Sequence, residues 1–436
     1  MLTKHVKSAV LLFAAITALL ILSAGAGAQE RAPIYQAITI KSAITPPVAS
    51  YILKSINDAV KDGADGLIIL LDTPGGLDLA MRDIVKGILS APIPVIVYVH
   101  PPGGRSASAG MIITIAAHVA AMAPGTNIGA AHPVAIGAGG KMDKTMADKV
   151  VNDAVAYVRG IAQKMGRNQD WAEKAVRKSI SAPAEEALRL KVIDYVATDV
   201  NDLLRQMHQR EVTLPSGKKT LNAKGAVVTE KTMGFRDKVL TAITDPNIAY
   251  ILLLIGLAGL YFEFSNPGAI VPGVVGGISL LLALFALQAL AVNYVGIILI
   301  LFAIVLFVAE IKVVSHGILT IGGVISLLLG SLMLFDTPDP SIKVSFEVLI
   351  PAVVITTLFF VVMITMGLKA QTRKNETGRE AMIGAEGETL TEVFKDGRIL
   401  FRGEYWQAYS DTLIEKGKKV RIVEVNRMKL KVQEEK

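Results

Sequence analysis

Two glycine-rich turns carry residue types suited to acyl-transfer chemistry. One turn ends in Gly75 and Gly76, and the other, over residues 101–110, contains Ser108; each turn follows an apolar run. Glycine lets the backbone approach a ligand and aim N–H groups at it, as an oxyanion hole requires. The two turns together favour a serine nucleophile. Taken alone, Ser108 fits a helix N-cap better, because serine is a preferred capping residue.

A serine nucleophile needs a base to take its proton, usually a histidine or a lysine that burial keeps neutral. The candidates near the serine are His100, His118, His132, Lys141, Lys144, Lys149 and Lys164. Lys149 lies at the margin of the apolar stripe of a predicted helix over 145–165, where spacing alone indicates an ordinary surface lysine. His118, at the end of an apolar helix, is expected to pack or cap. The residues by themselves leave the choice of base open.

Alternating strands and helices must position these turns. Continuous apolar runs at 66–72 and 94–99 predict strands covered on both faces. Helical spacing is found in segments 46–61, 77–89, 109–117 and 145–165. This alternation predicts βαβ units with a largely parallel sheet, in one α/β domain over residues 29–210.

Three further features are predicted within this domain and directly after it. Thr45 and Pro46 have the residue types of an N-cap and a first helical residue. The glycine-rich segment 136–142, before the helix of Lys149, is interpreted as a lid over a bound peptide. Residues 211–245 are polar without strong periodicity and are interpreted as a linker.

The chain is too apolar for a wholly soluble protein, since hydrophobic residues make up 52% of it. Between residues 246 and 368, about five apolar stretches are each near the ~20 residues that cross a bilayer. Glu263 in the first and glycines in the second also suit a re-entrant pair, so four to six crossings remain open. Five crossings that begin outside place the basic residues after 368 in the cytoplasm, as the positive-inside rule favours.

The N-terminus predicts export. Residues 1–28 carry Lys4 and Lys7, an apolar run and the small residues Ala26 to Ala28, the pattern of a cleaved signal peptide. An uncleaved anchor is the alternative, and it exports the same domain. The chain has no cysteine, which excludes disulfides, thiolate nucleophiles and cysteine-based zinc sites. Its net charge of +7 is attributed to flanks of membrane spans, so no nucleic acid partner is expected.

The C-terminal residues 378–436 predict a small β-barrel. Strands are indicated at 398–402, 420–425 and 430–432, and glycines punctuate the segment at turn-like intervals. No ligand is indicated by these residues.

Several motifs occur in one order along the α/β domain. They are Leu71–Gly76, Ser106–Gly110, Met122–Ala130, Ala156–Asn168 and Ala184–Leu188. Together they resemble the extracytoplasmic protease domain of the NfeD family, membrane-bound relatives of the Clp protease proteolytic subunit and of signal peptide peptidase A. The tail resembles the NfeD tail domain, an OB-fold, through Gly384, Gly387, Gly403, Trp406, Ala408 and Gly417. The implied fold is a Clp/crotonase-type spiral of α/β units, then transmembrane helices and an all-β OB-fold.

The resemblance implies a serine endopeptidase with a Ser-Lys dyad and no metal or cofactor. Ser108 falls at the family's nucleophile and Lys149 at its base. The implied oxyanion donors are the backbone N–H groups of Ala109 and of Gly76 or Gly75. Clp-type relatives use a histidine after the serine instead, and His132 lies near that place, so a Ser-His pair is the alternative.

The resemblance also implies a location and a partner. The expected protein sits in a bacterial or archaeal inner membrane as a homodimer or larger homo-oligomer, with the protease domain outside the cytoplasm and the tail inside. It is expected to cut hydrophobic segments of membrane-associated proteins, with a stomatin/prohibitin-like protein as partner.

Three rival interpretations come from other classes of protein. The first is a non-catalytic membrane scaffold for a stomatin-like partner. The second is a crotonase-fold acyl-CoA enzyme, and export argues against it because acyl-CoA is cytoplasmic. The third is a transporter, which the scarcity of ionisable residues within the spans disfavours.

Overall fold

The computed structural model describes most of the chain. Described are residues 31–134, 144–265, 268, 270–290, 292–313, 315–335, 343–371 and 379–435. The predicted signal peptide (1–28) and the predicted lid (136–142) lie outside these residues. The described residues form two compact units. The first contains the α/β domain and the apolar helices up to Ile304 and from Gly323 to Thr356, and the second contains the other helix parts and the C-terminal barrel.

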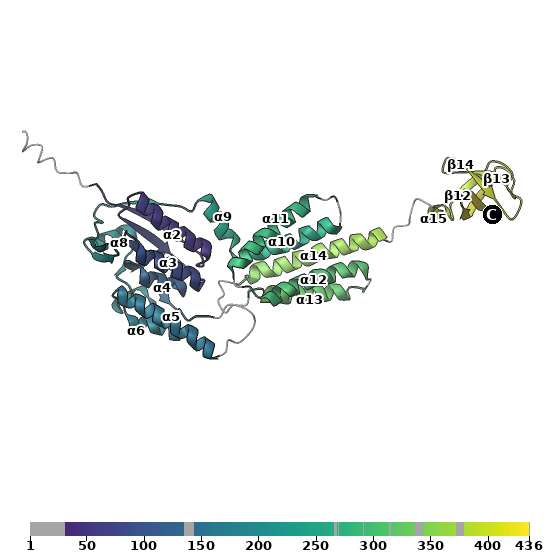
Figure 1. Ribbon diagram of the computed structural model, residues 1–436. Coiled ribbons are helices and arrows are strands. Elements are labelled where there is room, and N and C mark those ends of the chain that lie inside the picture. Colours follow the sequence, from purple (N-terminus) through teal and green to yellow (C-terminus); the bar gives the residue numbers. More distant parts are fainter. Residues whose placement is uncertain are drawn as a thin grey trace, which may run out of the picture. The chain divides into compact units, whose positions relative to one another are not determined.

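A six-stranded parallel sheet forms the centre of the α/β domain (Figure 1). Its strands, in spatial order, are β11 (Val227–Glu230), β1 (Ile34–Ile40), β2 (Gly66–Leu71), β3 (Val95–Val99), β5 (Val119–Met122) and β8 (Tyr195–Val196). Strands β2 and β3 are almost wholly buried, as their continuous apolar sequences predicted. Both predicted strands are therefore confirmed.

Helices surround this sheet on both faces. They are α2 (Pro46–Lys61), α3 (Asp78–Ser90), α4 (Ala109–Ala116), α5 (Lys144–Lys164), α6 (Gln169–Lys178), α7 (Ala184–Arg189) and α8 (Val200–Met207). Side chains alternate across a strand, so Leu67 and Ile69 join the core under α2 to α7, while Ile68 joins the core on the side of α8. The four predicted helices are confirmed within one residue at each end.

The N-cap prediction for α2 is only half right. Thr45 occupies the N-cap position before Pro46, but its side chain makes no capping hydrogen bond. Its buried hydroxyl has no partner among the described residues.

A small second sheet holds the loop that leads to Ser108. It consists of β4 (Arg105–Ala107), β6 (Asn127–Gly129) and β7 (Ser181–Pro183), with β4 parallel to β6. A bridge between Thr73 and Ser106 ties β4 to the first glycine-rich turn. The two turns predicted from the sequence are thus joined by backbone pairing.

The predicted linker over 211–245 is wrong. This segment folds as the hairpin β9 (Glu211–Leu214) and β10 (Gly217–Thr220), the edge strand β11 and the helix α9 (Phe235–Ile243). Val212 and Leu214 alternate with exposed residues and are buried in the core beside α8. So short an alternating pattern gives little signal in the sequence, yet it supplies one buried face.

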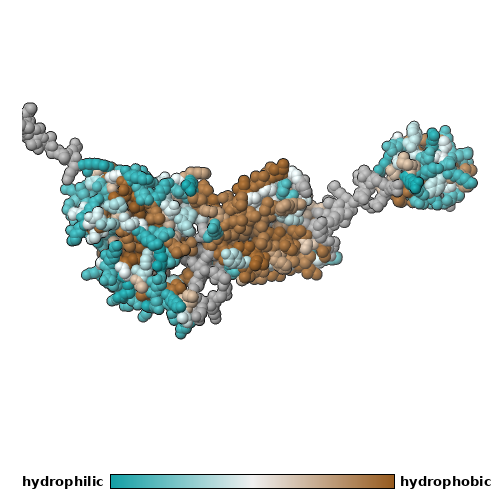
Figure 2. Space-filling view, in the orientation of Figure 1, coloured by the Kyte–Doolittle hydropathy of each residue, from teal (hydrophilic) through white to brown (hydrophobic). Residues whose placement is uncertain are grey.

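Five apolar helices follow. They are α10 (Pro246–Ser265), α11 (Ile270–Ala289), α12 (Tyr294–Lys312), α13 (Ile318–Met333) and α14 (Phe346–Gln371). Among the described residues, three segments are long and apolar enough to cross a membrane: Pro246–Ser265, Ile270–Gln288 and Phe346–Met366. Figure 2 shows a largely hydrophobic surface over these helices. Glycines bring α10 and α11 close, since a Cβ added at Gly259 would lie 2.8 Å from the Gly276 Cα.

The C-terminal domain is a closed five-stranded barrel, preceded by α15 (Arg379–Met382). Its strands are β12 (Glu386–Thr389), β13 (Gly397–Phe401), β14 (Glu404–Tyr409), β15 (Lys419–Asn426) and β16 (Lys429–Glu434). Its core includes Ile399, Ile422 and Leu430. The predicted barrel and its three predicted strands are confirmed, while β12 and β14 were not predicted.

His118 packs in the core of the α/β domain, as expected. Its side chain is 5% exposed, and the Val95 N–H donates a hydrogen bond to its Nδ1 at 3.1 Å. Burial, with smaller contributions from the positive charges of Arg167 and Lys164, lowers the pKa of His118 from 6.5 to about 4. The native state therefore holds this imidazole neutral.

This burial makes the domain sensitive to acid. Because the folded pKa is depressed, the stabilisation is fully present above pH 6.5 and is lost as the pH falls towards 4. It corresponds to roughly 3 kcal/mol. We expect His118→Asn, which keeps an acceptor for the Val95 amide and takes up no proton, to flatten the fall in thermal midpoint between pH 7 and pH 4. Calorimetry measures the thermal midpoint of both proteins across this pH range. An equal fall in the two proteins would contradict a buried, neutral His118 as the cause of the acid sensitivity.

Candidate active site

Ser108 occupies a strained turn between β4 and α4. Its φ of 52° and ψ of −116° are unfavourable for a residue with a Cβ. Ser108 occupies the N-cap position of α4, as the N-cap interpretation expected, but its side chain makes no capping bond. The Ser108 N–H donates to the Gly129 carbonyl at 2.9 Å, which holds the turn from the backbone side. A strained serine between strand and helix is the geometry in which hydrolases expose a nucleophile.

The neighbouring Ser106 has a different role. It is fully buried, and its hydroxyl lies 2.8 Å from the Thr114 hydroxyl. Gly110 allows this close packing, because a Cβ there would lie 2.5 Å from the Thr73 side chain. Of the two serines in the turn, Ser108 alone is partly exposed.

The structure separates the two candidate glycines of the oxyanion hole. The Gly75 N–H donates to the Thr73 hydroxyl at 3.2 Å, whereas no described residue accepts the Gly76 N–H. The Ala109 N–H, at the first position of α4, likewise has no acceptor among the described residues. Two unpaired amides next to a serine can stabilise a negatively charged oxygen. Gly76 and Ala109 therefore suit this role, and Gly75 does not.

One cavity of about 460 Å³ brings the predicted residues together. Gly76, Ser108, Ala109, His132 and Lys149 all line it, and Gly75 does not. Apolar side chains form much of the remaining wall: Met81, Ile112, Val134, Val150 and Ala154. Such a cavity suits an apolar polypeptide segment.

Lys149 lines this cavity from the N-terminal part of α5. Its side chain is exposed, and the described contacts include no hydrogen bond between it and Ser108. The two side chains thus share one cavity without touching in this structure.

An ion-pair cluster that the sequence did not reveal attaches α5 to α3. Arg82 on α3 donates to Asp78 at 2.8 Å and to Asp153 on α5. Its guanidinium also lies 4.3 Å from the centre of the Tyr157 ring. Arg82 and Asp153 line the cavity, so this cluster sets where α5 presents Lys149. The Asp78/Arg82 spacing of four residues was the available signal.

His132 also lines the Ser108 cavity. Its Nδ1 is 2.8 Å from the Val176 carbonyl oxygen. A carbonyl only accepts, so Nδ1 carries a proton and the neutral ring keeps Nε2 as an acceptor. No described carboxylate contacts the ring. His132 therefore has the tautomer of a base but no acidic partner.

Gly76 is needed for its shape as well as its amide. Its φ is 152°, and an added Cβ would lie 2.3 Å from the Ile44 carbonyl oxygen. We expect Gly76→Ala to lower the thermal midpoint by more than about 5 °C, because strain and clash together cost a few kcal/mol. Gly63→Ala is the matched control, since its φ is also positive but no atom lies within 4 Å of the new methyl group. Equal losses in the two variants would contradict the close packing against Ile44.

Models of known families match three parts of the chain. The NfeD1b N-terminal domain matches residues 34–213, the NfeD integral membrane domain residues 247–366, and the NfeD-like C-terminal, partner-binding domain residues 379–434.

Two relatives match along most of their length. Membrane-bound protease PH1510 of Pyrococcus horikoshii is 37% identical over 404 residues, which cover 90% of this chain and 91% of that protein. Membrane protein NfeD1b of Bacillus subtilis is 27% identical over 437 residues, 93% of each. A solved lysine-to-alanine mutant of the 1510-N membrane-bound stomatin-specific protease, in complex with a substrate peptide, is 38% identical. It covers 49% of this chain and 99% of its own, with a TM-score of 0.46.

Proposed function

The chain belongs to the NfeD family, and on this premise we propose that it is a membrane-bound serine endopeptidase with Ser108 as nucleophile. Its α/β domain has the Clp-type fold and its C-terminal barrel is an OB-fold. The observation that carries the proposal is the strained, uncapped Ser108 in one cavity with the unpaired amides of Gly76 and Ala109.

In the proposed mechanism, the free amine of Lys149 takes the proton of the Ser108 hydroxyl. The Ser108 Oγ attacks the carbonyl carbon of the scissile peptide bond, and the amides of Gly76 and Ala109 bind the oxyanion. Collapse of the tetrahedral intermediate passes the proton to the leaving amine and forms an acyl ester. Water activated by the same base then releases the acid.

Lys149 is proposed as the base from its match to the family's lysine. Its place in the Ser108 cavity, on a helix attached through Arg82 and Asp153, supports this choice. The Ser-His alternative is supported by the tautomer of His132 in the same cavity. The two chemistries predict opposite effects of Lys149→Ala and His132→Ala on activity.

The proposed substrate and partner is a stomatin-like membrane protein. Two findings support it: the relative named as a stomatin-specific protease, and the match to a partner-binding tail domain. The apolar wall of the cavity supports a hydrophobic target segment. We further propose that the protein is a homo-oligomer, with the protease domain outside the cytoplasm and the tail inside.

The direct test is cleavage in a membrane. The full chain and a stomatin-like protein from the same organism are incorporated together into liposomes, and fragments are followed over time by mass spectrometry. The proposal predicts cleavage within an apolar segment of the partner by the unaltered chain, and an intact partner with Ser108→Ala. Binding without cleavage would favour the scaffold interpretation instead.

A further inference from the structure

Helix α9 carries an apolar stripe on its outer surface. Phe235 is 85% exposed, Val239 is 37% exposed, and Ala242 is also exposed. Residues spaced by four and then three positions share one face of a helix, so these three side chains form a continuous stripe. The fold itself removes little of the Phe235 ring from water. Burial of this ring in another apolar medium would therefore stabilise the protein.

Two basic residues flank this stripe. Arg236 and Lys238 are both exposed, and at 3.6 residues per turn they fall on opposite sides of it. No ion pair among the described residues uses either side chain. An apolar stripe with basic residues at its borders is typical of a helix that lies in the interface between a membrane and water.

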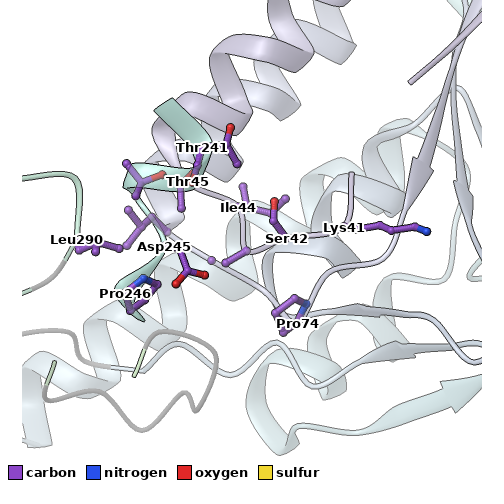
Figure 3. Close-up of a pocket in the computed structure, with 13 residues that line it drawn as sticks. Lys41, Ser42, Ile44, Thr45, Pro74, Thr241, Asp245, Pro246 and Leu290 are labelled. Carbon is purple, nitrogen blue, oxygen red and sulfur yellow. Dashed lines mark hydrogen bonds between the residues drawn. The ribbon is translucent and has the colours of Figure 1, made fainter. Parts of the chain in front are cut away.

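The opposite face of α9 is attached to the α/β domain. Asp237 accepts an ion pair from Lys54 of α2 at 3.3 Å, and its side chain is 19% exposed. Figure 3 shows Thr241 of α9 near Thr45, the residue before α2, and both line a cavity of about 260 Å³. The polar face of α9 is thus packed on α2, and the apolar stripe faces away from the domain.

The connection from α9 to the first apolar helix is short and ordered. Helix α9 ends at Ile243 and α10 begins at Pro246, a separation of at most about 11 Å along the chain. Between them, Thr244 is 1% exposed, and the Asp245 carboxylate accepts two N–H groups of the first turn of α10 at 2.8 and 3.3 Å. The match to an integral membrane domain starts at residue 247. The end of α9 therefore lies where the chain enters the membrane.

We propose that α9 is an interfacial helix that binds the phospholipid surface of the membrane. Phe235 and Val239 lie at the boundary between headgroups and acyl chains, and Arg236 and Lys238 contact lipid phosphates. Two observations favour lipid as the occupant: the positive charge beside the stripe, and the direct continuation of α9 into α10. Because α9 is packed on α2, this contact holds the α/β domain against the bilayer. The inference does not depend on the proposed protease function.

The test measures how deep the stripe lies in lipid. The chain has no cysteine, so Phe235→Cys and Val239→Cys each carry a single nitrobenzoxadiazole label. The labelled full chain is placed in nanodiscs of phosphatidylcholine and phosphatidylglycerol, whose two faces are open to water. We expect nitroxide-bearing lipids to quench both labels at a depth of ~5–10 Å, and dissolved iodide to quench them weakly. Val227→Cys, at a 54% exposed position of β11, is the matched control and should respond to iodide alone.

Further substitutions test the native side chains. In the labelled Val239→Cys protein, Phe235→Asp should raise iodide quenching to the level of the Val227→Cys control, whereas Phe235→Leu should preserve the protection. Neither change should shift the thermal midpoint in detergent, because the Phe235 side chain is exposed. Lys238→Gln should lower the ratio of lipid-exposed to water-exposed label about fivefold with phosphatidylglycerol present, and should have no effect in phosphatidylcholine alone.

Three results would overturn the interfacial helix. Labels at Phe235 and Val239 that respond to the two quenchers as the Val227 label does would place α9 in water. Labels protected from both quenchers would show that protein, such as a second copy of the chain, covers the stripe. Equal iodide quenching in Phe235→Asp and Phe235→Leu would remove the apolar contact as the cause of the protection.

Discussion

Ser108→Ala is expected to reduce peptide cleavage by the full chain at least about 10³-fold in kcat. Loss of a serine nucleophile removes the covalent pathway and leaves only the weak rate enhancement that an oxyanion hole and substrate binding supply. The protein should remain folded, because the side chain makes no capping bond in the native structure. Initial rates on an apolar peptide, with calorimetry on the same samples, measure both quantities.

Ser106→Ala is the matched control for this variant. Ser106 lies in the same turn but is buried against Thr114, so its loss should cost about 1 kcal/mol of stability and little activity. Ser108→Gly should separate activity from strain, since glycine tolerates a φ of 52°. It should be inactive and yet more stable than the unaltered protein by up to about 1 kcal/mol. Equal activity in Ser108→Ala and the unaltered chain would refute the nucleophile.

The second large effect is expected at Lys149. A base that takes the nucleophile's proton contributes about 10²- to 10⁴-fold, so Lys149→Ala should lower kcat within that range. His132→Ala should lower kcat less than about tenfold if it serves only to hold the cavity wall through Val176. Single-turnover rates on one peptide compare the two variants directly.

The matched control for Lys149 is Lys144→Ala, which changes another exposed lysine of α5. It removes the same charge from the same helix without touching the Ser108 cavity, so its activity should stay within about twofold of the unaltered chain. A reversed order, with His132→Ala inactive and Lys149→Ala active, would assign the chemistry to a Ser-His pair.

Periodicity and apolar runs gave most of the fold. Strands β2 and β3 and helices α2 to α5 follow patterns that local sequence sets. The strands and the helix after Met207 were not predicted. Their burial depends on contacts with the edge of the sheet and with α8, and no local sequence pattern indicates such contacts. The Thr45 cap failed for a related reason: residue type predicts the capping position, whereas tertiary packing determines what its hydroxyl contacts.

The candidate site was predicted less completely. Glycine content marked both turns, but only the pairing of Ile44 with the first turn and the Thr73 hydroxyl distinguish Gly76 from Gly75. The positive φ of Ser108 is likewise set by the second sheet around Gly129 and not by the serine itself. Arg82 and Asp153 are far apart in the sequence, so their contact depends on how α3 and α5 pack.

The central claim is that Ser108 is an activated nucleophile, and covalent labelling tests it most directly. The full chain is treated with a β-lactone probe, which an activated serine oxygen opens to give a stable acyl ester, and digested peptides are mapped by mass spectrometry. The account predicts the adduct on Ser108, its absence in Ser108→Ala and its presence in Ser106→Ala. An adduct on another residue, or labelling that persists in Ser108→Ala, would contradict it.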